Sequence, residues 1–360
     1  MNSFGDIFRL TTFGESHGPA IGGVIDGMPA GVSVDRALLD TCISRRRPGA
    51  GPGATRRSES DEVKILSGVF EGVTTGAPIG FVIENADANP EAYHRLRGVN
   101  RPSHADYTTT CKYGLRDHRG GGRSSARETA VRVAAGAFAE MALRSTGITV
   151  TAYVDSIGTV SLPVDYPAPE DSEKVYASPV RCPDEAVSEE MMRIVAEAGS
   201  QGDTLGGVVK CVIRGMVPGL GDPVGGKLHA RLGAAMLSIN AVKGFDYGMG
   251  FDGARLKGSE VADIFRKDES GDIRTLTNWS GGIQGGISNG EDIYFRVAFK
   301  PVPTMMRPVD TVDDAGEPVT LNPGGRHDVC VVPRAVAVVE AMAKIVILDA
   351  WLSNQTVRMR

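Results

Sequence analysis

The chain has 360 residues, of which 46 are glycine, and its 39 lysines and arginines against 44 aspartates and glutamates leave a formal net charge of −5 at pH 7. This length allows one large domain or two ordinary ones, and a glycine excess without a G-X-Y period excludes a collagen-like fibre. The mildly acidic balance disfavours general nucleic-acid binding, whereas local arginine clusters favour a small polyanionic ligand.

The cysteines and the absence of long apolar runs predict the compartment. No C-x-x-C pair occurs, and no apolar run approaches about 18 residues. The N-terminus has no basic-then-apolar signal pattern. We therefore expect a cytoplasmic protein that does not associate with membranes. The cysteines are odd in number and widely spaced, which predicts free thiols: Cys42, Cys111, Cys182, Cys211 and Cys330.

The first motif is Gly14-Glu15-Ser16-His17-Gly18, followed by a predicted strand over 20–24. It matches G-x-S-x-G, the nucleophile elbow of serine hydrolases. An elbow, however, lies between a strand and a helix with several strands before it, and here only 13 residues precede the motif. The hydrolase interpretation is therefore disfavoured, and a structural turn with a hydrogen-bonded histidine remains an alternative.

A helix is predicted over 33–44, with Ser33 suited to cap it. Arg45-Arg46-Arg47-Pro48-Gly49 stands at its end, where cations favour a helix C-terminus. Arg56-Arg57 follows soon after, which is more positive charge than capping needs. Because the arginine fork suits carboxylates and phosphates, anion binding is the alternative to a solvated charge run.

A second strand is predicted over 79–83, before the histidine of Arg101-Pro102-Ser103-His104-Ala105-Asp106. Taken alone, His104 is either a loop histidine or an acid catalyst. None of the six histidines shows the spacing of metal ligands, so no metal site is predicted. His94 and His229 are interpreted as surface or helix-face residues.

The sharpest motif is the glycine loop Gly120-Gly121-Gly122, followed at once by Arg123-Ser124-Ser125. Triple glycine lets backbone N–H groups approach a ligand closely. Ser125-x-x-Glu128 is a capping-box pattern for a helix to about Arg144, which Gly147 ends. A glycine loop that opens a helix is the usual geometry for holding an anion.

The remaining elements follow without strict βαβ alternation, so an α+β architecture in one domain over 1–360 fits best. Strands are predicted over 148–154, 208–213 and 293–299, helices over 183–199 (with Pro183 in the first turn), 227–239 and 333–352, and a hairpin over 310–321. The stretch 163–185, rich in proline and aspartate, is interpreted as a surface excursion. Arg326-His327-Asp328 precedes the last helix, where Asp328 either caps the helix or belongs to an acid–base site.

Taken together, these segments resemble the chorismate synthase family over nearly the whole chain, from Phe13 to about Met342. Three signatures carry the resemblance: 14–18 with 26–29, 122–129 with 134–136, and 326–328 with 340–342. Four further segments fall in the expected order between them: 45–49, 67–72, 112–114 and 238–244. Any one signature is moderately specific, whereas all of them in order are very specific.

The resemblance implies a carbon–oxygen lyase that removes phosphate and a ring proton from 5-enolpyruvylshikimate 3-phosphate and forms chorismate, the last step of the shikimate pathway. It implies a need for reduced FMN without net redox change. It further implies a β-α-β sandwich with helices enclosed between antiparallel sheets, a homotetramer, and a monofunctional enzyme that receives reduced FMN from an external flavin reductase or other supply.

The resemblance also implies residue roles. His17 would protonate the departing phosphate, His104 would serve the reduced flavin, and Asp328 would help to remove the ring proton; histidine suits such work because its pKa lies near neutrality. The substrate, which carries two carboxylates and a phosphate, would be held by Ser16, Arg46, Arg101 and Arg326. The flavin contacts would be Arg123, Ser124, Ser125, Asn240, Ala241, Gly285, Lys300, Pro301, Val302, Pro303, Thr304 and Arg326.

Four departures from the family pattern stand in this sequence. Ser103 occupies a position where glycine is common, so a different local turn is expected. Val329 replaces a frequent proline, and the 51–53 loop lacks a basic residue. Val302-Pro303 replaces more polar residues, which leaves that flavin contact to backbone groups and Thr304.

Two rival interpretations belong to other classes. A flavin-dependent oxidoreductase would transfer hydride to or from NADP(H), but no G-x-G-x-x-G opens a helix after a strand. A non-enzymatic anion-binding or scaffold protein would tolerate loss of His17 or His104, whereas an acid–base residue would not.

Overall fold

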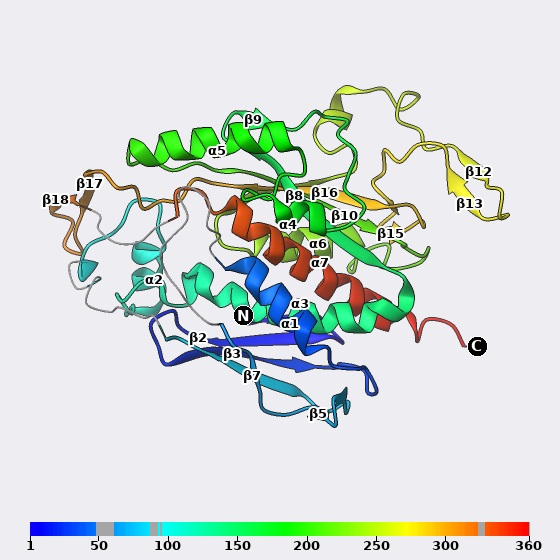
Figure 1. The fold of residues 1–360 in the computed structure, drawn as a ribbon, viewed down its shortest axis with the longest axis horizontal. Coiled ribbons are helices and arrows are strands. Elements are labelled where there is room, and N and C mark those ends of the chain that lie inside the picture. Colours follow the sequence, from blue (N-terminus) through cyan, green and yellow to red (C-terminus); the bar gives the residue numbers. More distant parts are fainter. Residues whose placement is uncertain (48–60, 87–92, 94–95, 323–327, 360) are drawn as a thin grey trace.

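The computed structural model describes residues 1–47, 61–86, 93, 96–322 and 328–359. Two five-stranded antiparallel sheets form its outer layers (Figure 1). The first sheet has the order β1 (Ser3–Phe4), β2 (Arg9–Gly14), β3 (Ala20–Asp26), β7 (Ile79–Glu84), β4 (Lys64–Ile65). The second has the order β11 (Val242–Tyr247), β16 (Ile293–Phe299), β10 (Gly207–Arg214), β8 (Thr149–Ile157), β9 (Val160–Ser161).

Helices fill the space between the two sheets (Figure 1). They are α1 (Arg36–Arg46), α3 (Thr129–Leu143), α6 (Leu228–Leu237) and α7 (Val332–Asn354). Helix α3 packs on β2 and β3, α7 packs on β8 and β10, and α3 and α7 pack on each other. Both helices are apolar on nearly every face, as expected for helices buried on all sides. The predicted α+β sandwich with enclosed helices is confirmed.

The contact between α3 and α7 depends on small side chains. A Cβ added to Gly136 would lie 2.4 Å from the Cβ and 2.5 Å from the Cα of Ala341. The backbones therefore approach more closely than a larger residue would allow. Gly136 and Ala341 belong to two signature segments, 134–136 and 340–342, and this helix crossing explains why these two positions hold small residues.

Shorter elements surround this core. Helix α2 (Asp106–Tyr113) lies beside the N-terminal end of α3, and α5 (Glu185–Ser200) covers the outside of the second sheet (Figure 1). Four hairpins and one short helix complete the fold: β5 (Val69–Phe70) with β6 (Val73–Thr74), β12 (Phe265–Lys267) with β13 (Ile273–Thr275), β14 (Ile283–Gln284) with β15 (Ile287–Ser288), β17 (Val309–Val312) with β18 (Pro318–Leu321), and α4 (Glu173–Ala177). Within the described ranges, no helix is long and apolar enough to cross a bilayer.

The predicted strands, the hairpin and the long helices are confirmed, but two helix starts are wrong. Asp35, rather than Ser33, caps α1 by accepting a hydrogen bond from the Leu38 amide at 2.9 Å. Ser33 instead forms a bridge with Val73. Asp184 caps α5, so Pro183 lies before the helix and not in its first turn. In each case a neighbouring aspartate provides the cap.

The predicted capping box at Ser125 is only half formed. Ser125 Oγ accepts a hydrogen bond from the Arg127 amide at 3.3 Å, and a 3₁₀ turn over Ala126–Glu128 precedes α3. Glu128 does not reach back to this cap, because its carboxylate pairs with Arg132 at 2.7 Å inside the core. Gly147, in the left-handed conformation, ends the helical segment as predicted.

The interpretation of 163–185 as a surface excursion is also wrong. Val175 and Cys182 are buried, with 0% and 1% of their surface exposed. The Tyr176 hydroxyl donates to Glu340 Oε2 at 3.0 Å, and the Arg45 guanidinium lies 4.1 Å from the Tyr176 ring centroid. Part of the segment is therefore tied to α1 and α7 through Tyr176 and buries apolar side chains, despite its polar composition.

Helix α7 also holds the N-terminal segment. The buried Asp349 carboxylate accepts hydrogen bonds from the Ile7 and Phe8 amides at 2.7 and 2.9 Å. Arg231 of α6 donates to the same carboxylate at 3.1 Å. A buried carboxylate with backbone and arginine donors is well compensated for its lost hydration. This arrangement fixes the entrance to β2, whose far end carries the first motif.

Candidate functional site

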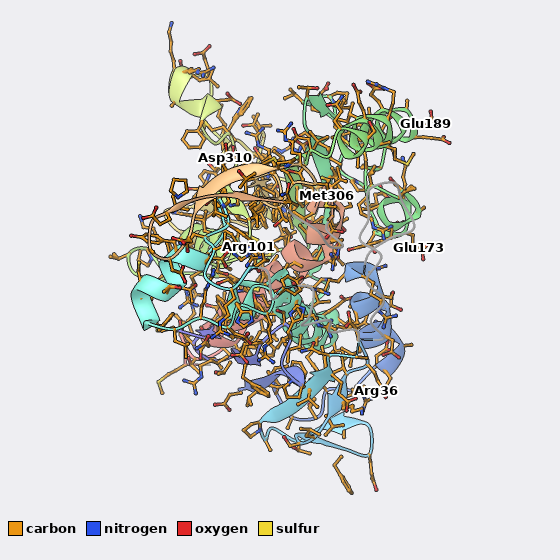
Figure 2. The ribbon with its side chains drawn as sticks, turned by 90° about the vertical axis from the view of Figure 1, so that its left-hand side faces the viewer. Arg36, Arg101, Glu173, Glu189, Met306 and Asp310 are labelled. Carbon is orange, nitrogen blue, oxygen red and sulfur yellow. The ribbon has the colours of Figure 1, made fainter. Side chains whose placement is uncertain are left out.

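The sequence motifs converge at one end of the helical layer, where α1 ends and α3 and α7 begin. Figure 2 looks onto this end, with Arg101 near its centre. Helix N-termini present unpaired amides and a positive dipole, which favour anions. The end of the helical layer is therefore electrostatically suited to an anionic ligand before any side chain is considered.

Ser16 and His17 follow β2 directly and are almost fully buried, with 2% and 9% of their surface exposed. Ser16 Oγ lies 2.9 Å from His17 Nδ1. The Tyr93 ring meets the imidazole edge-on, with centroids 4.7 Å apart. A serine and an aromatic ring therefore restrain the orientation of the imidazole, as a proton-transfer group requires.

The glycine loop closes over this histidine. Gly120 has a φ of +77°, and a Cβ built on it would lie 2.5 Å from both Cε1 and Nδ1 of His17. The same Cβ would lie 3.0 Å from Ser16 Oγ. The first and second motifs thus form one site, and the glycine is needed for backbone to reach the imidazole.

His104 lies at the start of α2, in a turn with an unusual backbone. Ser103 has a φ of +58°, the left-handed conformation that glycine adopts without strain. Ser103 thus adopts a conformation that glycine would also adopt, and a turn that differs from that of the family stays a prediction. Lys300 Nζ donates to the Ser103 carbonyl at 2.7 Å and links this turn to the end of β16.

Substitutions at Ser103 should report this strain. We expect Ser103→Val to lower the free energy of unfolding by about 1–2 kcal/mol, because a β-branched residue is poorly accommodated at positive φ. Ser103→Gly should leave it unchanged or raise it slightly. Chemical denaturation of both variants measures the difference, and equal stabilities for valine and glycine would contradict the left-handed assignment.

Asp106 is the centre of the charge network around this turn. Its carboxylate accepts from Arg101 Nε at 2.7 Å and pairs with Arg116 at 2.9 Å and with His104 Nδ1 at 3.0 Å. Burial alone would raise the pKa of Asp106, but the hydrogen bonds and charges of Arg101 and His104 outweigh it and hold that pKa well below its ordinary value. Asp106 is thus a permanently ionised acceptor.

Arg101, expected to contact substrate, has most of its guanidinium engaged within the protein. Besides the contacts to Asp106, Arg101 Nη2 donates to the Gly120 carbonyl at 2.9 Å. Its hydrogen bonds within the described residues use Nε and Nη2, which leaves Nη1 as the group that could meet a ligand. Arg101 also joins the His104 turn to the glycine loop.

Arg46 lies at the end of α1 with only 4% of its surface exposed. Its Nε donates to Thr129 Oγ1 at 2.9 Å and its Nη2 to the Ala126 carbonyl at 2.7 Å. Burial, together with the nearby Arg334 guanidinium, lowers the pKa of Arg46 to about 9. An anion placed here would offset both effects, so the sequence-based alternative of anion binding is favoured over a solvated charge run.

A cavity of about 80 Å³ is lined by Arg46, Arg334 and Asn240. Arg334 Nη1 donates to Asp328 Oδ2 at 2.5 Å, so Asp328 lies at the edge of this group. Asn240 Nδ2 donates to the Ser124 carbonyl at 2.8 Å, while its buried Oδ1 has no partner among the residues that the structure describes. Arg326, expected to contact both ligands, lies outside the described residues.

The expected flavin contacts fall into two groups. Ser124, Asn240, Ala241 and Lys300 come together, since the Lys300 amide donates to the Ala241 carbonyl at 3.0 Å. Pro301, Val302, Pro303 and Thr304 continue the same strand end, although the Val302 carbonyl already accepts from Thr204 at 2.8 Å. Ser125 serves as the helix cap described above. Arg123 donates to the Gly14 carbonyl and to Thr12 Oγ1, and so ties the glycine loop to β2.

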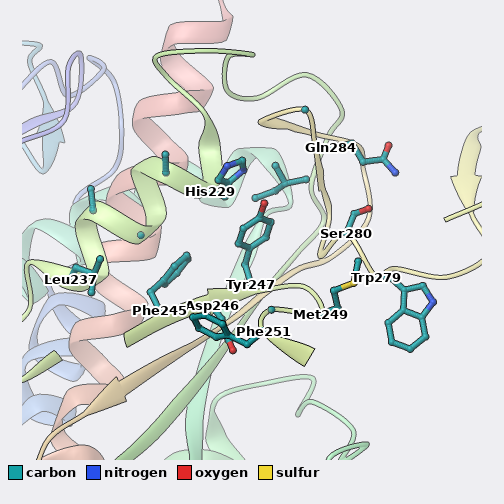
Figure 3. A pocket seen from close by; sticks show the side chains of 16 residues that line it. His229, Leu237, Phe245, Asp246, Tyr247, Met249, Phe251, Trp279, Ser280 and Gln284 are labelled. Carbon is teal, nitrogen blue, oxygen red and sulfur yellow. The ribbon is translucent and has the colours of Figure 1, made fainter. Parts of the chain in front are cut away.

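Gly285 is not part of this group. It lines a different cavity of about 900 Å³ between α6, β11 and the β14–β15 hairpin (Figure 3). Aromatic side chains dominate that cavity, with His229 stacked on Tyr247 at 4.7 Å. From the sequence, His229 was interpreted as a surface or helix-face residue. The helical periodicity of the sequence gave no indication that it lines an aromatic cavity.

Three charged residues near the site were not identified from the sequence: Asp61, Arg116 and Arg334. Asp61 pairs with Arg46 at 3.6 Å and also with Arg127. No motif marks these residues, and only their fold-determined partners reveal them. Asp106 had one signal, its position two residues after His104. Among the described residues, no group of histidine, cysteine and carboxylate side chains is arranged to hold a metal ion.

Comparisons with known proteins agree along the chain. The family model described as chorismate synthase matches residues 8–352. Curated chorismate synthases from Phocaeicola vulgatus and Bacteroides fragilis are each 55% identical, over 99% of both chains in the first case and 98% in the second. A crystal structure of chorismate synthase superposes with a TM-score of 0.79 at 32% identity, covering 98% of this chain and 94% of that one.

Proposed function

This chain belongs to the chorismate synthase family and is an enzyme of the carbon–oxygen lyase class, and we propose that it converts 5-enolpyruvylshikimate 3-phosphate into chorismate and phosphate with the help of reduced FMN. The observation that carries the proposal is the enclosure of the Ser16–His17 pair by the glycine loop, whose Gly120 carbonyl also accepts a hydrogen bond from the buried Arg101 guanidinium. A proton donor beside a water-poor cationic site is what loss of a phosphate group requires.

The roles proposed for the site residues follow from the charges of their side chains. Arg46, Arg101 through Nη1, and Arg326 bind the carboxylates and phosphate, and Ser16 helps to orient His17. His17 donates a proton to the departing phosphate oxygen. Asp328 accepts the ring proton, and its ion pair with Arg334 keeps the carboxylate in place at the mouth of the cavity. His104 lies across the glycine loop and serves the cofactor.

The chain's own groups fit a flavin at the far side of this site. The buried Asn240 Oδ1, without a partner among the described residues, is suited to accept a hydrogen bond from a ring N–H. Arg123, Ser124, Ser125, Ala241 and residues 300–304 would hold the rest of the cofactor, whereas Gly285 lines the separate larger cavity and is left out of this set. The flavin supplies transient electron density to the substrate, while the protein supplies position and charge.

Three further properties complete the proposal. The whole chain acts as one domain, a separate reductase or other source supplies reduced FMN, and the enzyme works in the cytoplasm as a homotetramer. The exposed aromatic rim of the larger cavity supports an assembly, because Phe251 and Trp279 are 80% and 39% exposed there.

The test is anaerobic incubation of the purified protein with 5-enolpyruvylshikimate 3-phosphate and chemically reduced FMN. Chorismate absorbance and phosphate release should rise in equal amounts, and only with reduced flavin. Flavin binding without turnover would contradict the proposal. Steady oxidation of NADPH by the protein and flavin alone would favour an oxidoreductase instead.

A further inference from the structure

The turn that carries His104 is held from two directions. Lys300, at the end of β16, donates its ammonium hydrogen to the carbonyl of Ser103, the residue directly before the histidine. On the other side, Asp106 contacts the imidazole itself, with Oδ1 at 3.0 Å from Nδ1. Backbone and side chain of the histidine position are thus fixed by residues on different elements, one 197 positions away in the sequence.

The Asp106 carboxylate can only accept hydrogen bonds. Four donors converge on its two oxygens: the Arg101 amide at 3.1 Å, the Arg101 guanidinium at 2.7 Å, Arg116 at 2.9 Å, and the His104 ring. The carboxyl side chain is buried with 6% of its surface exposed, and the Arg101 and Arg116 guanidiniums that pair with it favour its ionised form. An ionised carboxylate accepts and cannot donate, so the ring nitrogen that faces it must carry a proton.

We propose that Asp106 is a positioning residue that holds neutral His104 as the Nδ1–H tautomer and so presents Nε2 to the ligand site. This inference deepens the proposed function, on which it rests for the identity of the ligand. No hydrogen bond is recorded for Nε2 among the described residues, and the His104 side chain is 19% exposed. Nε2 is therefore the nitrogen through which this histidine exchanges protons.

Asp106 acts only through its neighbours. Its oxygens are taken by hydrogen-bond donors of the protein, chiefly Arg101, Arg116 and His104. A carboxylate that fixes the tautomer of an acid–base histidine lowers turnover when it is replaced by an amide, because the amide also stabilises the other tautomer. The effect should appear in kcat more than in KM.

The direct test is ¹⁵N spectroscopy of protein labelled at histidine, with the His104 signals identified by their loss in His104→Gln. Above pH 8, wild-type His104 should carry its proton on Nδ1. A predominant Nε2–H tautomer in the wild type would overturn the inference, and this measurement needs neither turnover nor a substituted Asp106.

The variant test compares Asp106→Asn with Arg116→Gln. Arg116→Gln removes another partner of Asp106 but leaves the contact between Asp106 and His104 in place. We expect Asp106→Asn to lose the Nδ1–H preference and to lower kcat about 10- to 100-fold, with KM within about 3-fold of wild type. Arg116→Gln should keep the tautomer and lose less than about 3-fold in kcat.

Two outcomes of this comparison count against the inference. An unchanged tautomer and kcat in Asp106→Asn would show that the carboxylate does not position the ring. An equal loss of kcat in Arg116→Gln would show that Asp106 merely stabilises the loop. Failure of the proposed function can be distinguished from failure of this inference. In the first case the wild-type protein would show no turnover, but the His104 tautomer could still be compared between the wild type and the variants.

Discussion

Gly120→Ala is expected to lower turnover about as far as removal of the His17 imidazole, roughly 10²- to 10⁴-fold. The added Cβ would lie 2.5 Å from two atoms of the His17 ring and 3.0 Å from Ser16 Oγ. Neither can withdraw easily, because both side chains are buried. The imidazole must rotate or the glycine loop must move, and either displaces the proposed acid from its substrate. Steady-state kinetics of Gly120→Ala and His17→Ala, measured side by side, check this.

The matched control is Gly114→Ala. Gly114 has a φ of +71°, close to the +77° of Gly120, but a Cβ at Gly114 meets nothing within 4 Å. It therefore carries the same backbone strain without the collision, and its turnover should stay within about 3-fold of wild type. If Gly114→Ala loses as much activity as Gly120→Ala, strain rather than contact with His17 is responsible.

Gly136→Val is expected to reduce the free energy of unfolding by more than about 3 kcal/mol, and Gly136→Ala by about 1–3 kcal/mol. The new Cβ would lie 2.5 Å from the Cα of Ala341, so the obstacle is backbone and cannot change rotamer. The two helices would have to separate along their whole contact, since both lie between sheets. Chemical denaturation at a fixed protein concentration measures the loss.

Gly233→Ala in α6 is the control for helix propensity. Its Cβ would meet the Phe245 ring at 3.2 Å, and a side chain can yield where backbone cannot. Alanine also gains about 1 kcal/mol over glycine in a helix interior. We expect its stability to stay within about 1 kcal/mol of wild type. Equal losses at Gly136 and Gly233 would refute a special role for the α3–α7 crossing.

The local sequence pattern was sufficient to predict those elements in which buried positions recur regularly along the chain. Helix α7 is mostly apolar and strand β16 alternates buried and half-buried residues, and both were predicted close to their observed bounds. Strand β11 was missed, because the predicted helix ends at 239 and no element was predicted over the residues that follow it. Its pairing with β16, which makes it a strand, is a contact about fifty positions away and leaves no local periodicity.

By itself, the sequence determined the family, the order of elements and which residue types gather in the motifs, because glycine loops, caps and apolar periods act over a few residues. Only the tertiary structure decided the partners. Gly120 meets His17, Arg101 turns to Asp106, Lys300 reaches the Ser103 carbonyl, and Gly285 lines a separate cavity. Such contacts join distant segments through the packing of both sheets on the helices. This packing depends on the fit of shapes and charges across the whole core, and no short stretch of sequence encodes that fit.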